Sequence, residues 1–435
     1  MKIVVAGTGY VGLVTAVCLS EVGHTVTCVD VVEEKIKMLN EGKSPIYEPG
    51  LEELMLKNKE KLTYTLDSKN AYKNADVIFI GVGTPEKKDG SANLKYVYQV
   101  AKEIAENIEK DTIIVLKSTV PIGTNSKMEK FIKANLKNNV KIEVVSNPEF
   151  LAQGTAVRDT LYAQRIVIGV NSEHAEKVMR QVYNGFDIPY VITNRESAEM
   201  IKYASNDFLA LKVSYINEIA NLCEIVGADV SDVAKGMGMD SRIGNKFLQA
   251  GIGYGGSCFP KDTKALHWLG NFYDYELKTV KAAIEVNANQ KLRLIKKARK
   301  YYETFEGLNV AVLGLTFKPN TDDLREAPSL DNIPILLDYG AKVKAFDPVG
   351  ENNFKKFYPN EIEYCQTIED TIKDADICFI FTEWEDVKEF DINKYKELMK
   401  KPIVIDGRNC YDLSSVEGKG IIYESIGRKV INIKK

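Results

Sequence analysis

The feature that most constrains the fold is a glycine-rich segment directly after the first apolar run. Lys2–Ala6 has the composition of a strand, the segment Gly7–Gly12 reads GTGYVG, and Leu13–Val22 has helical apolar spacing. In a βαβ unit the first glycine permits the tight turn, the second lets a pyrophosphate approach the backbone, and the third allows close helix packing. The segment therefore predicts a dinucleotide at a helix N-terminus. The expected contacts are Gly7, Gly9, Tyr10, Val11 and Gly12.

A second strand and an acidic residue support this interpretation. Thr25–Val29 is a short apolar run that ends at Asp30, 18 residues after Gly12. A carboxylate here binds the adenosine ribose hydroxyls and disfavours a 2′-phosphate, so the expected cofactor is NAD. Lys35 is expected beside the same ribose.

Strands and helices then alternate. Strand-like runs occur at residues 77–80, 112–116 and 142–145, and a helical pattern covers residues 94–108. This alternation predicts a doubly wound parallel sheet, whose ligands bind at the carboxyl ends of the strands. Thr84, Thr119 and Glu149 follow three such ends, so they are candidate site residues, with turn or cap residues as the alternative.

A long helical pattern over residues 197–227 is expected to link two domains, and the helical region continues to about Tyr302. Lys202 and Asn206 are four residues apart in it, which places a cation and an amide on one helix face. The alternative is an ordinary solvated charge.

Inside the helical region, Gly253–Thr263 reads GYGGSCFPKDT and contains a cysteine just before a proline. Pro260 is expected to be the first residue of a helix, so Cys258 would precede its N-terminus, where a thiolate is favoured. Lys261 adds a cation, and Asp262 is a candidate base or orienting group. The alternative is a glycine-rich turn with a buried cysteine.

A second βα unit begins near residue 307. Residues 309–314 and 341–346 read as strands around a helix ending at Asp338, but the phosphate-binding glycines are missing, so this domain need not bind a dinucleotide. Phe317, Lys318 and Arg325 in its first loop and Arg408 after a later strand suit a base-stacking surface and a diphosphate.

Composition excludes several classes. The 435 residues suffice for two or three domains, and 58 basic against 61 acidic residues give a net charge of −3, which favours neither nucleic acid nor a membrane as a partner. Seven cysteines without CxxC pairs indicate neither disulfides nor a metal site. With no signal peptide or membrane span recognisable, the expected location is cytoplasmic.

These motifs together resemble the UDP-glucose/GDP-mannose dehydrogenase family over essentially the whole chain. The evidence is the N-terminal fingerprint, the cysteine loop, Phe317-Lys318, and Gly238–Gly244, which reads GMDSRIG as in the UDP-glucose members. The resemblance implies an α/β fold of two Rossmann-like doubly wound domains joined by a long central helix. It divides the chain into an NAD-binding domain (1–196), a central helical dimerisation region (197–302) and a UDP-sugar-binding domain (303–435). It also implies a homodimer.

The resemblance further implies a four-electron oxidation of UDP-glucose with two NAD+ and one water. Cys258 would form a thiohemiacetal and then a thioester, and Glu149 would assist hydrolysis of the thioester. Lys202 and Asn206 would stabilise the oxyanion. Asp262 and a water held by Thr119 would accept and donate protons. The remaining expected cofactor contacts are Thr84, Thr119, Gln153, Lys261 and Arg325. The expected substrate contacts are Glu149, Phe150, Leu151, Lys202, Asn206, Arg242, Phe247, Leu248, Gln249, Ala250, Gly251, Gly255, Phe317, Lys318 and Arg408, with Arg242 reaching across a dimer interface.

Some alternatives stay open. Gln153 stands where many relatives carry a glutamate, which puts a role as a base there in doubt. The substrate could instead be UDP-N-acetylmannosamine or GDP-mannose. A single-step hydroxyacid dehydrogenase would have no use for Cys258, and a non-enzymatic NAD-binding redox sensor would not need Lys202, Asn206 and Asp262 as well.

Overall fold

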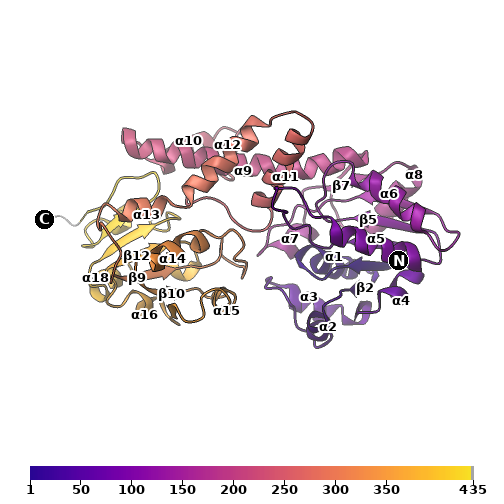
Figure 1. The fold of residues 1–435 in the computed structure, drawn as a ribbon, viewed down its shortest axis with the longest axis horizontal. Coiled ribbons are helices and arrows are strands. Elements are labelled where there is room, and N and C mark those ends of the chain that lie inside the picture. The colour runs from indigo at the N-terminus through magenta and orange to yellow at the C-terminus, as the bar shows by residue number, and fades with distance from the viewer. Residues whose placement is uncertain (433–435) are drawn as a thin grey trace. The chain divides into compact units, whose positions relative to one another are not determined.

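The computed structural model describes residues 1–432. The chain forms two compact units, Met1–Ser205 and Asn206–Lys435. Helix α9 (Arg195–Val226) is continuous and belongs to both units (Figure 1). Each unit is built around its own sheet.

The first unit contains an eight-stranded sheet in the order β3-β2-β1-β4-β5-β6-β7-β8. All neighbours pair in parallel except β6 and β7, which meet antiparallel at Ser146 and Gly169. The central strands β1, β4 and β5 are almost entirely buried, as expected for parallel strands covered on both faces. The strands are β1 (Lys2–Ala6), β2 (Thr25–Val29), β3 (Leu62–Thr65), β4 (Val77–Ile80), β5 (Thr112–Leu116), β6 (Ile142–Ser146), β7 (Ile166–Gly169) and β8 (Tyr190–Thr193).

Helices cover both faces of this sheet (Figure 1). One face packs against α1 (Tyr10–Glu21), α2 (Glu33–Asn40), α3 (Leu51–Lys57), α7 (Ala156–Leu161) and α8 (Glu173–Val182). The other packs against α4 (Ser68–Lys73), α5 (Lys95–Asn107) and α6 (Thr124–Asn135). The sheet is therefore doubly wound, and its carboxyl edge is free to present loops.

The second unit begins with helices: α10 (Val230–Gly238), α11 (Phe259–Phe272), α12 (Lys278–Gln290) and α13 (Arg293–Ala298). The helical pattern predicted to run to about Tyr302 is divided between α12 and α13. At the division, the carbonyl of Lys291 accepts a hydrogen bond from the Asn332 amide at 2.9 Å. A polar side chain from a distant helix thus satisfies the backbone where the helix ends.

A six-stranded parallel sheet completes the second unit, in the order β11-β10-β9-β12-β13-β14. This is the order of the first six strands of the N-terminal sheet, so the two sheets share one topology. The strands are β9 (Asn309–Leu313), β10 (Lys342–Phe346), β11 (Ile362–Tyr364), β12 (Ile377–Ile380), β13 (Ile403–Asp406) and β14 (Ile422–Glu424). The covering helices are α14 (Pro328–Asp338), α15 (Glu351–Phe354), α16 (Ile368–Ile372), α17 (Glu385–Lys388), α18 (Asn393–Leu398) and α19 (Leu413–Val416).

The predicted fold class is confirmed: two doubly wound parallel α/β domains are joined by a long helix. Among residues 1–432, no helix is long and apolar enough to cross a membrane. All seven cysteines lie in this range, and none of them forms a disulfide.

Candidate active site

The glycine segment forms the turn between β1 and α1. Gly9 is the N-cap of α1 and has open space around its Cα, with no atom within 4 Å of where a Cβ would stand. At Gly12 a Cβ would lie 2.0 Å from the carbonyl oxygen of Gly7, so only glycine fits. The helix N-terminus is thus reachable from outside while the turn beneath it is tightly packed, which fits a bound pyrophosphate.

Asp30 lies beside this turn. Its Oδ2 accepts hydrogen bonds from the Thr8 N–H at 2.8 Å and the Thr8 hydroxyl at 2.6 Å, and its Oδ1 accepts from the Val32 N–H at 3.0 Å. Burial alone would raise the pKa of Asp30, but these hydrogen bonds and the charge of Lys35 lower it. An ionised carboxylate beside a lysine fits the hydroxyls of a ribose.

Thr84 and Thr119 follow the neighbouring strands β4 and β5. The Thr84 hydroxyl donates to the Thr119 carbonyl at 2.9 Å, so these two predicted cofactor residues lie together at the carboxyl edge. Gln153, also predicted to contact the cofactor, is buried in the loop after β6.

Glu149 and Lys202 form a buried ion pair in the first unit. Their Oε1 and Nζ atoms are 2.9 Å apart, and the side chains are 6% and 3% exposed. The second carboxylate oxygen of Glu149 accepts from the Leu151 N–H at 2.8 Å, and the Lys202 ammonium lies 5.4 Å from the centre of the Phe150 ring. The structure therefore brings the predicted residues 149–151 and Lys202 together.

Lys117, which sequence reasoning missed, belongs to the same region. Its ammonium donates to Asn147 Oδ1 at 3.1 Å and to the Tyr183 hydroxyl at 3.2 Å, and the Tyr183 hydroxyl also donates to Asn147. Burial lowers the pKa of Lys117 to about 8, the charge of Glu149 opposes this, and that of Lys202 adds to it. The sequence did contain a sign of this role, because a lysine directly after an apolar strand is unusual. The partners of Lys117 could not be predicted, since they are 30 and 66 residues away in the sequence.

In the second unit, Cys258 is the N-cap of α11. Phe259 is the first helical residue, so Pro260 is the second and not the first as predicted. The Asp262 N–H donates to the Cys258 carbonyl at 2.8 Å, which closes the first turn. The thiol thus stands at the end of a helix dipole, where a thiolate is favoured.

Asp262 is the centre of a polar cluster on this turn. It is wholly buried, its Oδ2 accepts from the Asn206 amide at 2.7 Å, and its Oδ1 pairs with the Lys261 ammonium. Asn206 lies on α9 and belongs to the same unit as Cys258, Lys261 and Asp262, so the structure joins Asn206 to the turn that follows Cys258. Lys202, predicted to act with them, belongs to the first unit and pairs with Glu149.

Arg408, predicted to contact the substrate, joins the cysteine loop to the Phe317 loop and to the residue after β12. Its guanidinium donates to the carbonyls of Gly253 at 3.0 Å, Phe317 at 3.2 Å and Phe381 at 2.9 Å. At Gly255 a Cβ would lie 2.9 Å from the Phe317 Cβ, so the cysteine loop packs directly on the Phe317 loop. Lys318 lies 5.7 Å from the Phe317 ring centre.

Other predicted residues lie nearer the surface. Arg242 is exposed and pairs with Asp240 at 2.6 Å, and Arg325 is exposed and pairs with Asp323 at 2.7 Å. In the segment 247–251, Leu248 and Ala250 are buried and Gln249 is exposed, while Phe247 adopts φ of 64°, which is unusual for a residue with a side chain.

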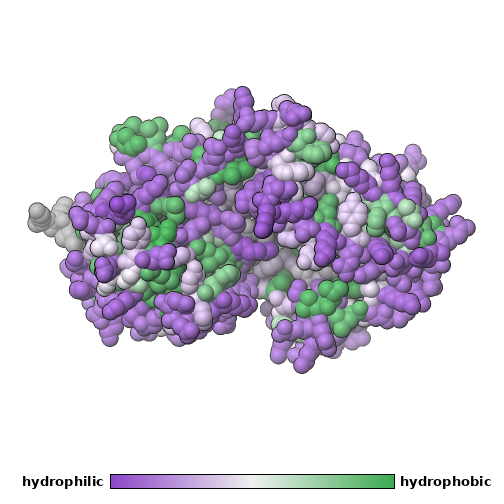
Figure 2. Space-filling view, viewed as in Figure 1, coloured by the Kyte–Doolittle hydropathy of each residue, from purple (hydrophilic) through white to green (hydrophobic). Residues whose placement is uncertain are grey.

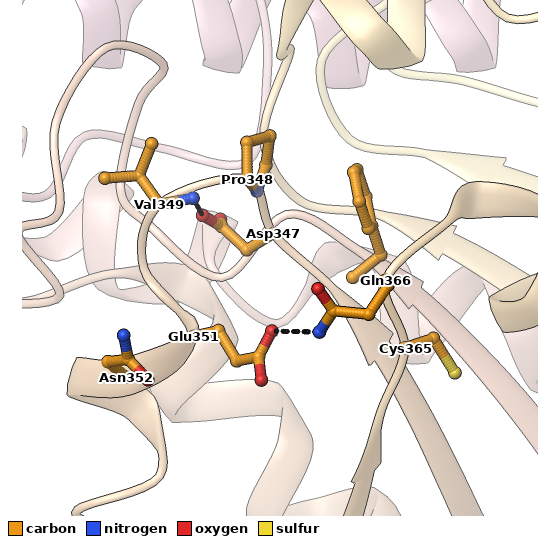
Figure 3. A pocket seen from close by; sticks show the side chains of 8 residues that line it. Asp347, Pro348, Val349, Glu351, Asn352, Cys365 and Gln366 are labelled. Atoms are coloured by element: carbon orange, nitrogen blue, oxygen red, sulfur yellow. Dashed lines mark hydrogen bonds between the residues drawn. The ribbon is translucent and has the colours of Figure 1, made fainter.

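A pocket of about 310 Å³ lies at the end of β10 (Figure 3). Asp347 follows β10 as Asp30 follows β2. Its carboxylate oxygens accept hydrogen bonds from the protein itself. Among the donors are the backbone N–H groups of Leu315, Thr316, Val349 and Gly350 and the Trp384 indole. On the opposite wall, Gln366 donates to Glu351 at 3.3 Å. The five named donors saturate the Asp347 carboxylate, which offers about four acceptor positions, whereas Asp30 accepts three hydrogen bonds within residues 1–432 and keeps a position for a ribose.

Fold and site define a dinucleotide-dependent dehydrogenase with a cysteine-bearing helix, and comparisons specify the family. Residues 1–187, 196–289 and 311–413 match the NAD binding, central and UDP binding domains of the UDP-glucose/GDP-mannose dehydrogenase family. The chain belongs to this family. The predicted family, the NAD cofactor and the class of NAD-dependent oxidoreductase are therefore confirmed, and the C-terminal domain is one that binds UDP-sugars.

Three relatives illustrate the similarity. UDP-glucose 6-dehydrogenase YwqF of Bacillus subtilis is 48% identical over 99% of this chain and 98% of its own. The structure of a UDP-glucose dehydrogenase from Pyrobaculum islandicum matches with a TM-score of 0.92 at 34% identity, covering 98% of both chains. That of a UDP-D-ManNAc dehydrogenase from Pyrococcus horikoshii matches with 0.86 at 28% identity, covering 98% and 99%.

Proposed function

We propose that this protein oxidises UDP-glucose to UDP-glucuronate in two successive two-electron steps, using two NAD+ and one water. The observation that carries the proposal is Cys258 at the N-cap of α11, with Asp262 and its partner Asn206 on the following turn. A dehydrogenase that stops at the aldehyde needs no nucleophile, whereas oxidation to an acid through a thioester does.

UDP-glucose is favoured over other nucleotide sugars by sequence identity. The relative named for UDP-glucose is 48% identical to this chain, and the one named for UDP-D-ManNAc is 28% identical. The GMDSRIG segment at 238–244, typical of the UDP-glucose members, points the same way.

The proposed chemistry assigns one role to each polar group. The primary alcohol of the glucose is first oxidised to an aldehyde, losing a proton to the acid-base groups and a hydride to the cofactor. The Cys258 thiolate then attacks this aldehyde to give a thiohemiacetal, whose oxidation gives a thioester that water hydrolyses. Bound NAD+ supplies the hydride acceptor in both oxidations. Lys202 and Asn206 stabilise the oxyanion, because each can direct N–H donors at it. Asp262 and a water held by Thr119 move protons, and Glu149 assists hydrolysis.

The remaining residues bind the two ligands. We assign the cofactor to the turn Gly7–Gly12, Asp30, Lys35, Thr84 and Thr119, with Gln153, Lys261 and Arg325 as further contacts. The substrate is assigned to Glu149–Leu151, Phe247–Gly251, Gly255, Phe317, Lys318 and Arg408. The corresponding division of the chain is 1–196, 197–302 and 303–435.

We also propose a homodimer that forms along α9. Phe208, Tyr215 and Leu222 are exposed at seven-residue intervals, which places three apolar side chains on one helix face. Ile225, three residues after Leu222 on α9, extends this apolar face. Met239 at the end of α10 is exposed as well, and Figure 2 shows hydrophobic residues gathered near α10. A second copy would cover the stripe and bring its Arg242 to a neighbouring site. The cytoplasm is the proposed location, in keeping with seven cysteines that form no disulfide.

A panel of nucleotide sugars tests the proposal. Purified protein with NAD+ is supplied with UDP-glucose, UDP-N-acetylmannosamine or GDP-mannose, and NADH and acid products are measured. UDP-glucose should give by far the highest kcat/KM, with UDP-glucuronate as product. A preference for another sugar would refute the substrate assignment. A small 2-hydroxyacid is included in the panel as a fourth substrate, and NADH formation with this substrate alone would refute the mechanism as well.

A further inference from the structure

Asp207 is a buried acid that the proposed mechanism does not use. It follows Asn206 on α9, it is 5% exposed, and neither of its carboxylate oxygens meets a hydrogen-bond donor within residues 1–432. A buried carboxylate without donors is costly, because nothing replaces its hydration. A protonated carboxylic acid in the same place avoids most of that cost.

The positive charge that acts on Asp207 belongs to Lys261, which is already paired with Asp262. The charges that act on Asp207 are those of Asp262 and Lys261 on α11, and Asp207 acts in turn on Tyr254 in the loop before that helix. Lys261 is paired with Asp262, which also takes the Asn206 amide. Two carboxyl groups thus share one cation, and Asp262 accepts from both the ammonium and the amide.

We propose that Asp207 is a positioning residue that stays protonated in the working enzyme and thereby leaves the donors of Lys261 and Asn206 on Asp262. This inference deepens the proposed function, on which its catalytic part rests. Asp207 touches no substrate in this scheme. It acts through Asp262, the acid-base group on the turn that begins at Cys258.

The ionisation of Asp207 has a defined consequence. Burial raises the pKa of Asp207 to about 8, the charge of Asp262 adds to this rise, and that of Lys261 opposes it. Above that pH a second carboxylate competes for Lys261 and repels Asp262, so the hydrogen bonds that orient Asp262 weaken. Turnover should therefore fall on the alkaline side because Asp207 loses its proton.

The first test is the pH profile of kcat for UDP-glucose oxidation in wild type and in Asp207→Asn, since asparagine resembles the neutral acid in size and charge. Wild type should lose about tenfold per pH unit above pH 8, as one ionisation requires. This limb should vanish or move upward by at least one pH unit in D207N. Asp187→Asn, which changes an exposed aspartate in a loop, should keep the wild-type profile. A D207N profile identical to that of wild type would overturn the proposal.

The second test needs no catalysis. The pKa of Asp207 is raised from 3.8 in the unfolded chain to about 8 in the folded protein. The folded protein therefore keeps a proton that the unfolded chain releases, and the stability that this group contributes at low pH is lost as the pH rises from about 4 to 8. The melting temperature of D207N relative to wild type should therefore increase between pH 5 and pH 9, while that of Asp187→Asn should stay constant. An unchanging D207N difference would show that Asp207 is ionised throughout.

The two tests fail separately. If the wild type does not oxidise UDP-glucose, the proposed function is wrong, but the melting series still decides whether Asp207 carries a proton. If the melting series behaves as expected and the kcat profiles coincide, Asp207 is protonated without positioning Asp262, and the proposal is refuted.

Discussion

The glycine turn at the start of the chain permits a prediction in which folding and cofactor binding are separated by two similar substitutions. Gly9→Ala adds a methyl group where no atom lies within 4 Å, whereas Gly12→Ala adds one 2.0 Å from the Gly7 carbonyl oxygen. The two positions are three residues apart on one turn. They differ in whether the protein or the ligand occupies the space.

The expected magnitudes follow from these distances. In Gly9→Ala, alanine is a poorer N-cap residue than glycine, which lowers the free energy of unfolding by up to about 1 kcal/mol. Alanine also reduces the conformational freedom of the unfolded chain, which raises the free energy of unfolding by about 0.4–1 kcal/mol, so the net change in stability is small. In Gly12→Ala, helix propensity returns about 1 kcal/mol, but a backbone contact more than 1 Å too short costs about 3 kcal/mol or more, so we expect a net loss of about 2 kcal/mol.

The cofactor should show a different order. The methyl group that G9A introduces stands where the pyrophosphate approaches the backbone, so this variant should bind NADH at least about tenfold more weakly, which is about 1.4 kcal/mol. Unfolding in urea should be followed by circular dichroism, because both tryptophans, Trp268 and Trp384, lie in the second unit. NADH binding is followed by nicotinamide fluorescence. G9A with wild-type affinity, or G12A with wild-type stability, would refute the assignment of this turn.

Four further predictions follow from single sites. Cys258→Ser should abolish UDP-glucuronate formation, measured by chromatography, and leave NADH binding intact; normal acid formation would exclude the thioester. Gln153→Glu should change kcat by less than about tenfold, or 1.4 kcal/mol, and a larger change in steady-state assays would show a direct role. Lys202→Met should lower the free energy of unfolding, measured in urea, by about 3 kcal/mol, because it removes the ammonium that pairs with the buried Glu149. Adding Glu149→Gln to the same chain should restore most of this stability, and no restoration would contradict the pairing. The pKa of Lys117 is lowered from 10.5 to about 8 in the folded protein, so between these pH values the folded protein binds fewer protons than the unfolded chain. The free energy of unfolding should therefore rise with pH from about 8 to 10.5. Lys117→Met should remove that rise, as measured by urea unfolding.

Much of the first unit could be predicted from the sequence because its signals are local. The runs at residues 2–6, 25–29, 77–80 and 112–116 are strands with the predicted ends, because each is a short and mostly apolar run. The strands β3, β7 and β8 were not predicted. The strands β3 and β8 lie at the sheet edges and are only partly buried, so their sequences lack a continuous apolar run.

The candidate site was predictable where residues share a motif and unpredictable where they meet across the chain. Cys258, Lys261 and Asp262 stand in one segment, and their common turn follows from Pro260. The ion pair of Glu149 with Lys202 spans 53 residues, and the sequence showed only two separate candidates. Lys117 and Asp207 are buried by segments that are distant in the sequence, so in the sequence alone each resembles an ordinary surface charge.

The measurement that tests the central claim most directly is the amount of NADH formed per UDP-glucose consumed when the sugar is limiting. The account predicts two NADH, with UDP-glucuronate as the product, because the Cys258 thioester carries the substrate through both oxidations. One NADH per sugar, with an aldehyde product, would contradict it.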